Sequence, residues 1–96
     1  MSTIQIKTPS PDQALSLVKG ALEMETKLTR DSLKTSEERI ATLTQQLGVT
    51  INQVLEGSVS RTEENEQAFL ELEGELEICR LLQDTLGHLE QLEVCS

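Results

Sequence analysis

Hydrophobic side chains recur every three or four residues along the C-terminal third of the chain. This spacing places them on one face of an α-helix, which turns by about 100° per residue. The face consists of Phe69, Leu72, Leu76, Cys79, Leu82, Leu86 and Leu89. Ile78, Leu81 and Leu92 widen it beyond what one partner helix can cover. The pattern therefore predicts a long helix over about residues 60–94 that packs against at least two neighbouring helices.

Residues 70–78 also fit a second pattern. Apolar residues or glycine alternate there with glutamate, which is the period of a half-buried β-strand. Glutamate is depleted in strands, whereas leucine and glutamate both favour helices. The three-and-four spacing continues beyond Ile78, so we expect a helix here. Gly74 and the like-charged glutamates around it make this segment the weakest part of that helix.

The first half of the chain predicts another long helix, over about residues 11–47. Ser10 can accept hydrogen bonds from free amides, Pro11 suits the first helical position, and Gln13 completes a capping box. Gly48 can end the helix. The inner stripe of apolar residues consists of Leu15, Val18 and Leu22, then Leu33, Ile40, Leu43 and Leu47.

A polar interruption divides this inner stripe. Its positions between residues 25 and 36 include Glu25, Thr29 and Ser36. The apolar residues nearby form a neighbouring stripe: Leu17, Ala21, Met24 and Leu28. Either the helix rotates its buried face in this region, or it breaks near Asp31. We expect a continuous helix.

The middle of the chain predicts a turn, a short helix and another turn over about residues 48–59. Thr50 with Gln53 forms a second capping box, Gly57 permits a stop, and Ser60 with Glu63 forms a third box that would open the last helix. The two long helices can then form an antiparallel hairpin. We expect residues 10–96 to be one helical domain.

Residues 1–9 precede this domain and are expected to be a flexible segment. Within residues 3–8, Ile4 and Ile6 alternate with polar residues and could instead add a short strand to a partner's sheet. The segment lacks the basic start and apolar core of a signal peptide, and no run of the chain approaches the roughly 20 apolar residues that span a bilayer. We therefore expect a cytoplasmic protein.

Residues 43–57 resemble the helix-turn-helix of small repressors. The matching positions are Leu43, Leu47, Gly48, Val49 and Val54, whereas Thr44 and Gly57 depart from the usual Ala and aliphatic residue. The resemblance implies a transcriptional regulator with a recognition helix after Gly48. That helix would present Thr50, Ile51, Asn52, Leu55 and Glu56, without a basic residue for phosphates or guanine edges. A simple turn between helices is the favoured interpretation.

Charge is divided unevenly along the chain. Residues 1–50 hold six basic and six acidic side chains, whereas residues 51–96 hold two basic and eleven acidic ones, which accounts for the whole net charge of −9. This acidic half disfavours nucleic acids and anionic membranes and would suit a basic protein partner. The acidic residues that could face such a partner are Glu63, Glu64, Glu66, Glu71, Glu73, Glu75 and Glu77.

Residues that could support catalysis or hold a cofactor or metal are nearly absent. His88 is the only histidine, and Thr85 stands where a di-iron bundle needs glutamate, so we expect His88 to pair with Asp84 on the surface. Cys79 and Cys95 are about 24 Å apart along one helix, too far for a disulfide. Cys79 lies on the apolar face and suits burial. We expect no enzyme activity, cofactor or metal site.

These patterns together predict an all-α protein, a hairpin of two long amphipathic helices. With a single aromatic residue, Phe69, its core must rely on aliphatic packing. Two helices cannot cover the wide apolar face, so we expect dimerisation into a four-helix bundle or coiled-coil assembly. The face from Phe69 to Leu89 is the predicted oligomer interface. The function this suggests is a protein–protein interaction module of the adaptor, assembly or chaperone-like kind.

Overall fold

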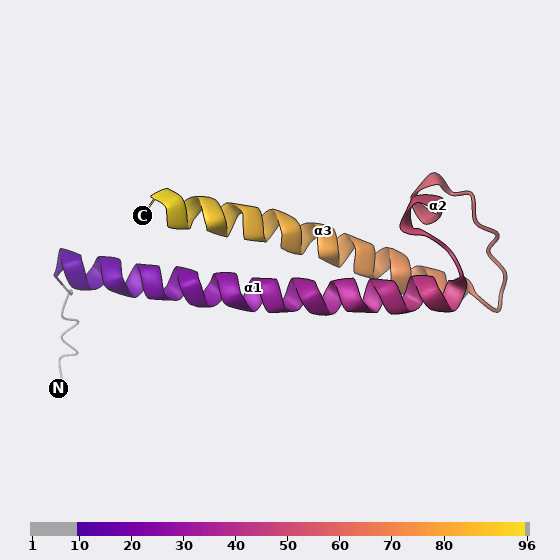
Figure 1. Cartoon of the computed structure of the whole chain (residues 1–96), viewed down its shortest axis with the longest axis horizontal. Helices are drawn as coiled ribbons and strands as arrows, with labels where there is room; N and C mark the ends of the chain where they lie inside the picture. The colour runs from indigo at the N-terminus through magenta and orange to yellow at the C-terminus, as the bar shows by residue number, and fades with distance from the viewer. Residues whose placement is uncertain (1–9, 96) are drawn as a thin grey trace, which may run out of the picture.

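The computed structural model describes residues 10–95, and they form three helices. Helix α1 spans Pro11–Leu47, α2 spans Ile51–Glu56, and α3 spans Glu66–Cys95. The two long helices run antiparallel and side by side, as Figure 1 shows. Within residues 10–95 there is no strand, so the all-α prediction is confirmed. The predictions for residues 3–8 fall outside the described part of the chain.

Helix α1 begins and ends where local signals place it. The Ser10 hydroxyl accepts a hydrogen bond from the Gln13 amide at 3.4 Å, and the Gln13 side chain accepts one from the Ser10 amide at 3.3 Å. Gly48 ends the helix in the left-handed conformation, with φ of 67°. The helix continues without a break through Asp31. The expected continuous helix is therefore confirmed. The alternative of a rotated buried face is wrong, because Thr29 and Ser36 of the inner stripe stay buried while Met24 and Leu28 stay exposed.

Helix α2 is a single short segment closed at both ends. Thr50 and Gln53 form the reciprocal bonds of a capping box, and Gly57 closes the helix with φ of 70°. Val49 and Val54 pack against the core cluster. The segment therefore folds back over the closed end of the hairpin, where Figure 1 places it.

Helix α3 begins at Glu66, later than the start near residue 60 that the sequence predicted. The reciprocal bonds form at Thr62 and Asn65 instead: the Thr62 amide donates to Asn65 Oδ1 at 2.6 Å, and the Asn65 amide donates to Thr62 Oγ1 at 3.3 Å. Arg61 holds this start in place. Its guanidinium binds Glu66 through two hydrogen bonds of 2.8 and 2.9 Å and lies over the Phe69 ring, 5.2 Å from the centroid.

The apolar core lies near the closed end of the hairpin. Ile40 of α1 packs with Leu72 and Cys79 of α3, and Leu72 is completely buried. The side chains packed around this cluster are Leu33, Leu43, Leu47, Val49, Val54 and Leu76. The packing of α1 on α3 therefore buries apolar surface chiefly over this half of the molecule.

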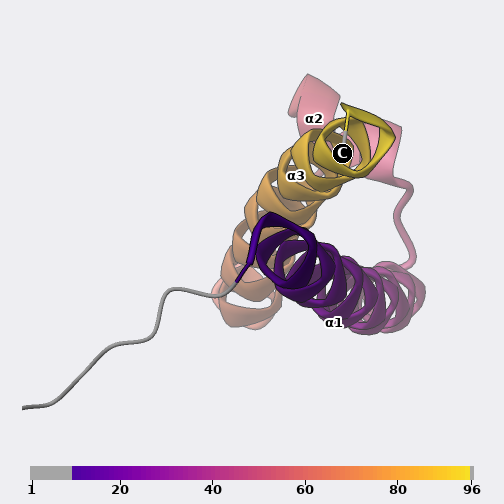
Figure 2. The same cartoon turned by 90° about the vertical axis from the view of Figure 1, so that its left-hand side faces the viewer.

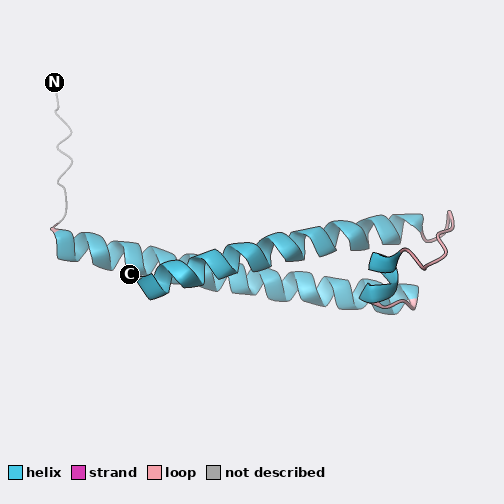
Figure 3. Cartoon of the chain, turned by 90° about the horizontal axis from the view of Figure 1, so that it is seen from above, coloured by secondary structure: helices cyan, strands magenta, loops and turns pink. Residues whose placement is uncertain are grey.

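Toward the open end the helix interface becomes polar. Thr26, Thr29 and Ser36 are buried on the α1 side. The Thr26 hydroxyl lies 2.7 Å from the Leu22 carbonyl oxygen and 2.6 Å from Glu93 Oε1 of α3. Figures 2 and 3 show the two helices crossing at an angle. Small polar side chains bury little apolar area, so this end of the hairpin gains less hydrophobic stabilisation.

Substitution of Gly48 tests the sharp end of α1. Alanine there must adopt a φ of 67°, so we expect Gly48→Ala to lower the free energy of unfolding by about 1 kcal/mol. Gly20→Ala is the matched control, because Gly20 lies inside α1 with open space around it. This variant should raise the free energy of unfolding by up to about 1 kcal/mol. Urea denaturation followed by circular dichroism measures both. A stabilising Gly48→Ala would contradict the left-handed cap.

Candidate interaction surface

The predicted oligomer face of α3 is used largely within the chain. Phe69, Leu72 and Cys79 are buried, and the other four members are half-buried: Leu76, Leu82, Leu86 and Leu89. Leu72, Leu76 and Cys79 belong to the core shared with α1. The apolar side chains that remain for a partner are those that the hairpin leaves exposed.

Exposed apolar side chains lie on both long helices. On α3 they include the three that widened its apolar face, Ile78, Leu81 and Leu92, and also Leu70 and Val94. On α1 they include the neighbouring stripe, in which Leu17, Met24 and Leu28 are 67%, 59% and 51% exposed. Within residues 10–95, folding of the hairpin therefore leaves a second apolar stripe on each long helix without a covering helix.

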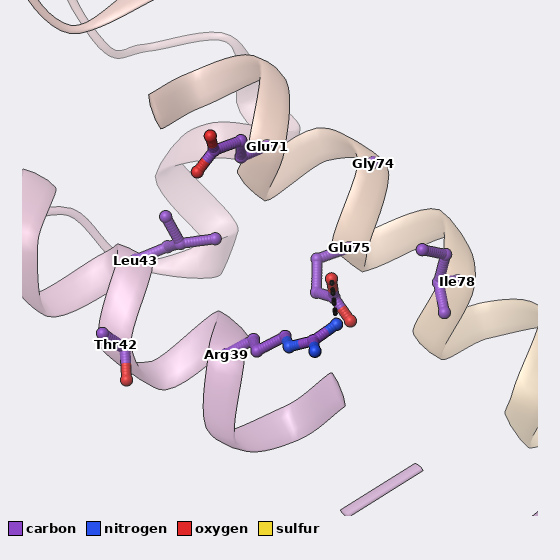
Figure 4. A pocket seen from close by; sticks show the side chains of 7 residues that line it. All are labelled: Arg39, Thr42, Leu43, Glu71, Gly74, Glu75 and Ile78. Atoms are coloured by element: carbon purple, nitrogen blue, oxygen red, sulfur yellow. Dashed lines mark ion pairs between the residues drawn. The ribbon is translucent and has the colours of Figure 1, made fainter. Parts of the chain in front are cut away.

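A groove runs between α1 and α3 on one side of the hairpin (Figure 4). Near the core it has a volume of about 470 Å³, and its α3 wall includes Gly74, which contributes no side chain. The Arg39 guanidinium reaches across it to the Glu75 carboxylate at 3.9 Å. Toward the open end the groove continues past Arg39 and Ile78 to Leu28 and Leu82. Its floor is mainly apolar, interrupted by one ion pair.

The predicted acidic face is partly neutralised by the chain's own arginines. Glu66 and Glu73 both bind Arg61, and Glu77 binds Arg80. The hydrogen bonds from Arg80 hold the pKa of Glu77 below its ordinary value. Glu75 lies against α1, with 12% of its side chain exposed.

The other three predicted acidic residues are exposed: Glu63, Glu64 and Glu71. Glu63 and Glu64 precede α3, whereas Glu71 lines the groove. The seven glutamates therefore do not form one continuous patch.

Cys79 is poorly suited to act as a nucleophile. Its side chain is buried in the core, and this burial raises the pKa of the thiol, to which the charges of Glu37 and Glu75 add. A raised pKa keeps the sulfur protonated near neutral pH, whereas the thiolate is the reactive form. Cys79 therefore serves as a small apolar core residue.

Two other motifs that the sequence indicated can be located in the structure. Asp84 accepts a hydrogen bond from Arg80 at 3.1 Å, where the sequence predicted a pair with His88. Among the described side chains, no group of three or more His, Cys, Asp or Glu residues is arranged to hold a metal ion. Helix α2, which occupies the place of a recognition helix, has only 6 residues and no basic side chain.

Sequence reasoning described the stripe of Leu17, Ala21, Met24 and Leu28 only as the neighbour of a polar interruption in the buried face, and so missed it as a candidate surface. The signal was its own regular spacing of four, three and four residues, which matches the seam of a coiled coil. The bridge from Arg39 to Glu75 was also missed. It joins residues far apart in the sequence, so no local pattern indicates it.

Comparison with models of known protein families, with curated proteins and with solved structures yields no match. None of the described helices combines the length and apolar character needed to cross a bilayer.

Proposed function

We propose that this protein is a non-catalytic helical interaction module of the adaptor, assembly or chaperone-like kind, and that it associates with a second copy of itself. The observation that carries the proposal is the amount of apolar side-chain surface that one hairpin leaves uncovered on both long helices. Leu17, Met24 and Ile78 are among these side chains. Exposed apolar stripes of this kind are typical of surfaces that bind other proteins.

The shape of the chain supports the same proposal. A compact monomer of 10.7 kDa has an accessible surface of roughly 5500 Å², whereas this hairpin has 7563 Å². Its radius of gyration is 20.7 Å, against roughly 12.5 Å for a compact domain of this length. Association of two hairpins would reduce this excess surface.

A basic protein is proposed as a further partner. The chain carries a net charge of −9, and Glu63, Glu64 and Glu71 remain exposed. Such a charge attracts basic surfaces and repels nucleic acids and anionic membranes. This attraction is screened by salt, so binding of a basic partner should weaken as ionic strength rises.

The native mass of the purified chain tests self-association. Size exclusion coupled to light scattering is expected to give twice the chain mass of 10.7 kDa at micromolar concentration. Dilution should shift the mass toward one chain, because association depends on concentration. A mass of one chain at every concentration up to about 1 mM, where even a Kd near 1 mM would show, would reject self-association.

A further inference from the structure

We infer that two copies associate through the N-terminal half of α1, antiparallel and offset, so that the free start of each α1 lies in the groove of the other subunit. This inference rests on the proposed self-association and specifies its surface and register. The seam is the stripe on α1 formed by Ala14, Leu17, Ala21, Met24 and Leu28.

Among the residues that the structure describes, the register of the hairpin leaves the start of α1 without a partner helix. Thr26 meets Glu93 and Arg30 meets Glu90, so the last turn of α3 lies level with about residues 22–26 of α1. Residues 11–21 therefore extend beyond the end of α3, as Figures 1 and 3 show. Leu15 and Val18, which point along the inner stripe, are about half exposed there for this reason. A second helical surface beside this overhang would cover them.

The outer stripe of α1 has the spacing of a coiled-coil seam. Its members follow one another at intervals of three, four, three and four residues, and those beyond Ala14 are exposed. We consider an antiparallel pair of α1 helices related by a twofold axis that lies level with the point between residues 22 and 23. This axis brings Leu17 level with Leu28 of the partner subunit. The same alignment places Ala21 level with Met24 of the partner subunit. Beside the axis a small residue, Ala21, then faces a large one, Met24, which allows close packing there. The contact is self-complementary, as a twofold interface requires.

Charge selects this contact over one between the C-terminal helices. Residues 11–34 contain four basic and four acidic side chains, whereas α3 contains one basic and eight acidic ones. Pairing α3 with α3 would bring two net charges of −7 together. In the offset arrangement the two α3 helices lie on opposite sides of the twofold axis, because each α3 ends near the level of that axis. The neutral halves of α1 meet instead, over residues 11–34, a length of about 36 Å.

The overhang of one copy then reaches the groove of the other. Residues 11–21 lie level with residues 24–34 of the second copy, where the groove is lined by Leu28, Ser32 and Leu82. This part of the groove lies on the same side of α1 as the outer stripe. The occupant of the open end of the groove is therefore the start of a second α1, and the occupied site is completed only in the dimer.

Cysteine pairing tests the register. Two variants are prepared in a Cys95→Ser background, Leu17→Cys and Leu28→Cys, with Cys79 retained because it is buried. Mild oxidation of the mixture is expected to give a disulfide-linked heterodimer, with several-fold more cross-linked product than either variant alone. Within one homodimer of either variant the two new cysteines would be about 16 Å apart, beyond disulfide reach. Ala14→Cys mixed with Asp31→Cys gives an independent second pair, because these two positions are also level in this alignment.

A third mixture supplies the control. Leu17→Cys with Leu55→Cys combines two exposed positions that the offset dimer keeps apart, so it should give only the background seen in urea. Cross-linking of Leu17→Cys with itself would instead show a parallel dimer and overturn the inference. Equal product in all mixtures would also overturn it. If the native mass is still that of a dimer in either of these two cases, this register is rejected but the proposed self-association is retained.

Discussion

Replacing Leu72 with alanine is expected to lower the free energy of unfolding by about 2–5 kcal/mol. Leu72 is the only completely buried leucine among the described residues, and it packs with Ile40 of α1 and Cys79 of α3. Truncation removes the apolar contacts of Leu72 and leaves a cavity. Because the hairpin buries few apolar residues, few neighbouring side chains can move to fill this cavity. The total stability of a chain of this length is about 5–15 kcal/mol, so the loss is a large fraction of it.

Urea denaturation followed by helical circular dichroism measures this loss. Wild type and variant are compared at the same chain concentration, since the proposed dimerisation would add concentration-dependent stability. Leu81→Ala is the matched control, because Leu81 is half exposed. This variant should lower the free energy of unfolding by less than about 1.5 kcal/mol. Equal losses at Leu72 and Leu81 would contradict the position of the core.

The second large effect is expected for Met24→Glu, which should convert the dimer to a monomer. Met24 is 59% exposed in the single hairpin, so glutamate there should not unfold the chain. In the offset dimer it lies in the seam opposite Ala21, and two carboxylates are buried for each dimer formed. Loss of the two apolar side chains alone weakens association by on the order of 100-fold or more. Light scattering at a fixed concentration would record a fall to the mass of one chain.

Leu70→Glu is the matched control for Met24→Glu. Leu70 is 53% exposed near the start of α3, at the closed end of the hairpin and beyond the stretch where the two copies overlap, so this variant should remain dimeric. A side-by-side four-helix bundle gives the opposite pattern, because there the exposed apolar stripe of α3 is covered along its whole length. Dissociation by Leu70→Glu with retention of the dimer by Met24→Glu would therefore favour that bundle and reject the offset contact.

The sequence predicted those features that depend on residues close together in the chain. The capping boxes at Ser10 and at Thr50, and the glycine ends at Gly48 and Gly57, all form in the structure. Each involves hydrogen bonds over three to five positions, so the residues present are enough to specify it. The start of α3 is the exception. Ser60 and Glu63 have the composition of a capping box, but the box forms at Thr62 and Asn65 instead.

The reason for this exception is a contact beyond one helical turn. Arg61 binds Glu66 and Glu73 and covers Phe69, and these three residues are 5 to 12 positions away. The box at Thr62 and Asn65 leaves Arg61 outside the helix, where its guanidinium reaches these three side chains. A pattern that considers three or four neighbouring residues cannot include this interaction.

The sequence by itself determined that the chain is helical, where most of its helix ends lie and that its apolar residues exceed what one helix can bury, since spacing and capping are local properties. Only the tertiary structure decided which apolar stripe is covered and which is left. That choice depends on the register of α3 along α1, set by contacts such as Ile40 with Leu72 and Thr26 with Glu93. In the same register α3 covers α1 only as far as about residues 22–26, so within the described part of the chain residues 11–21 have no covering helix.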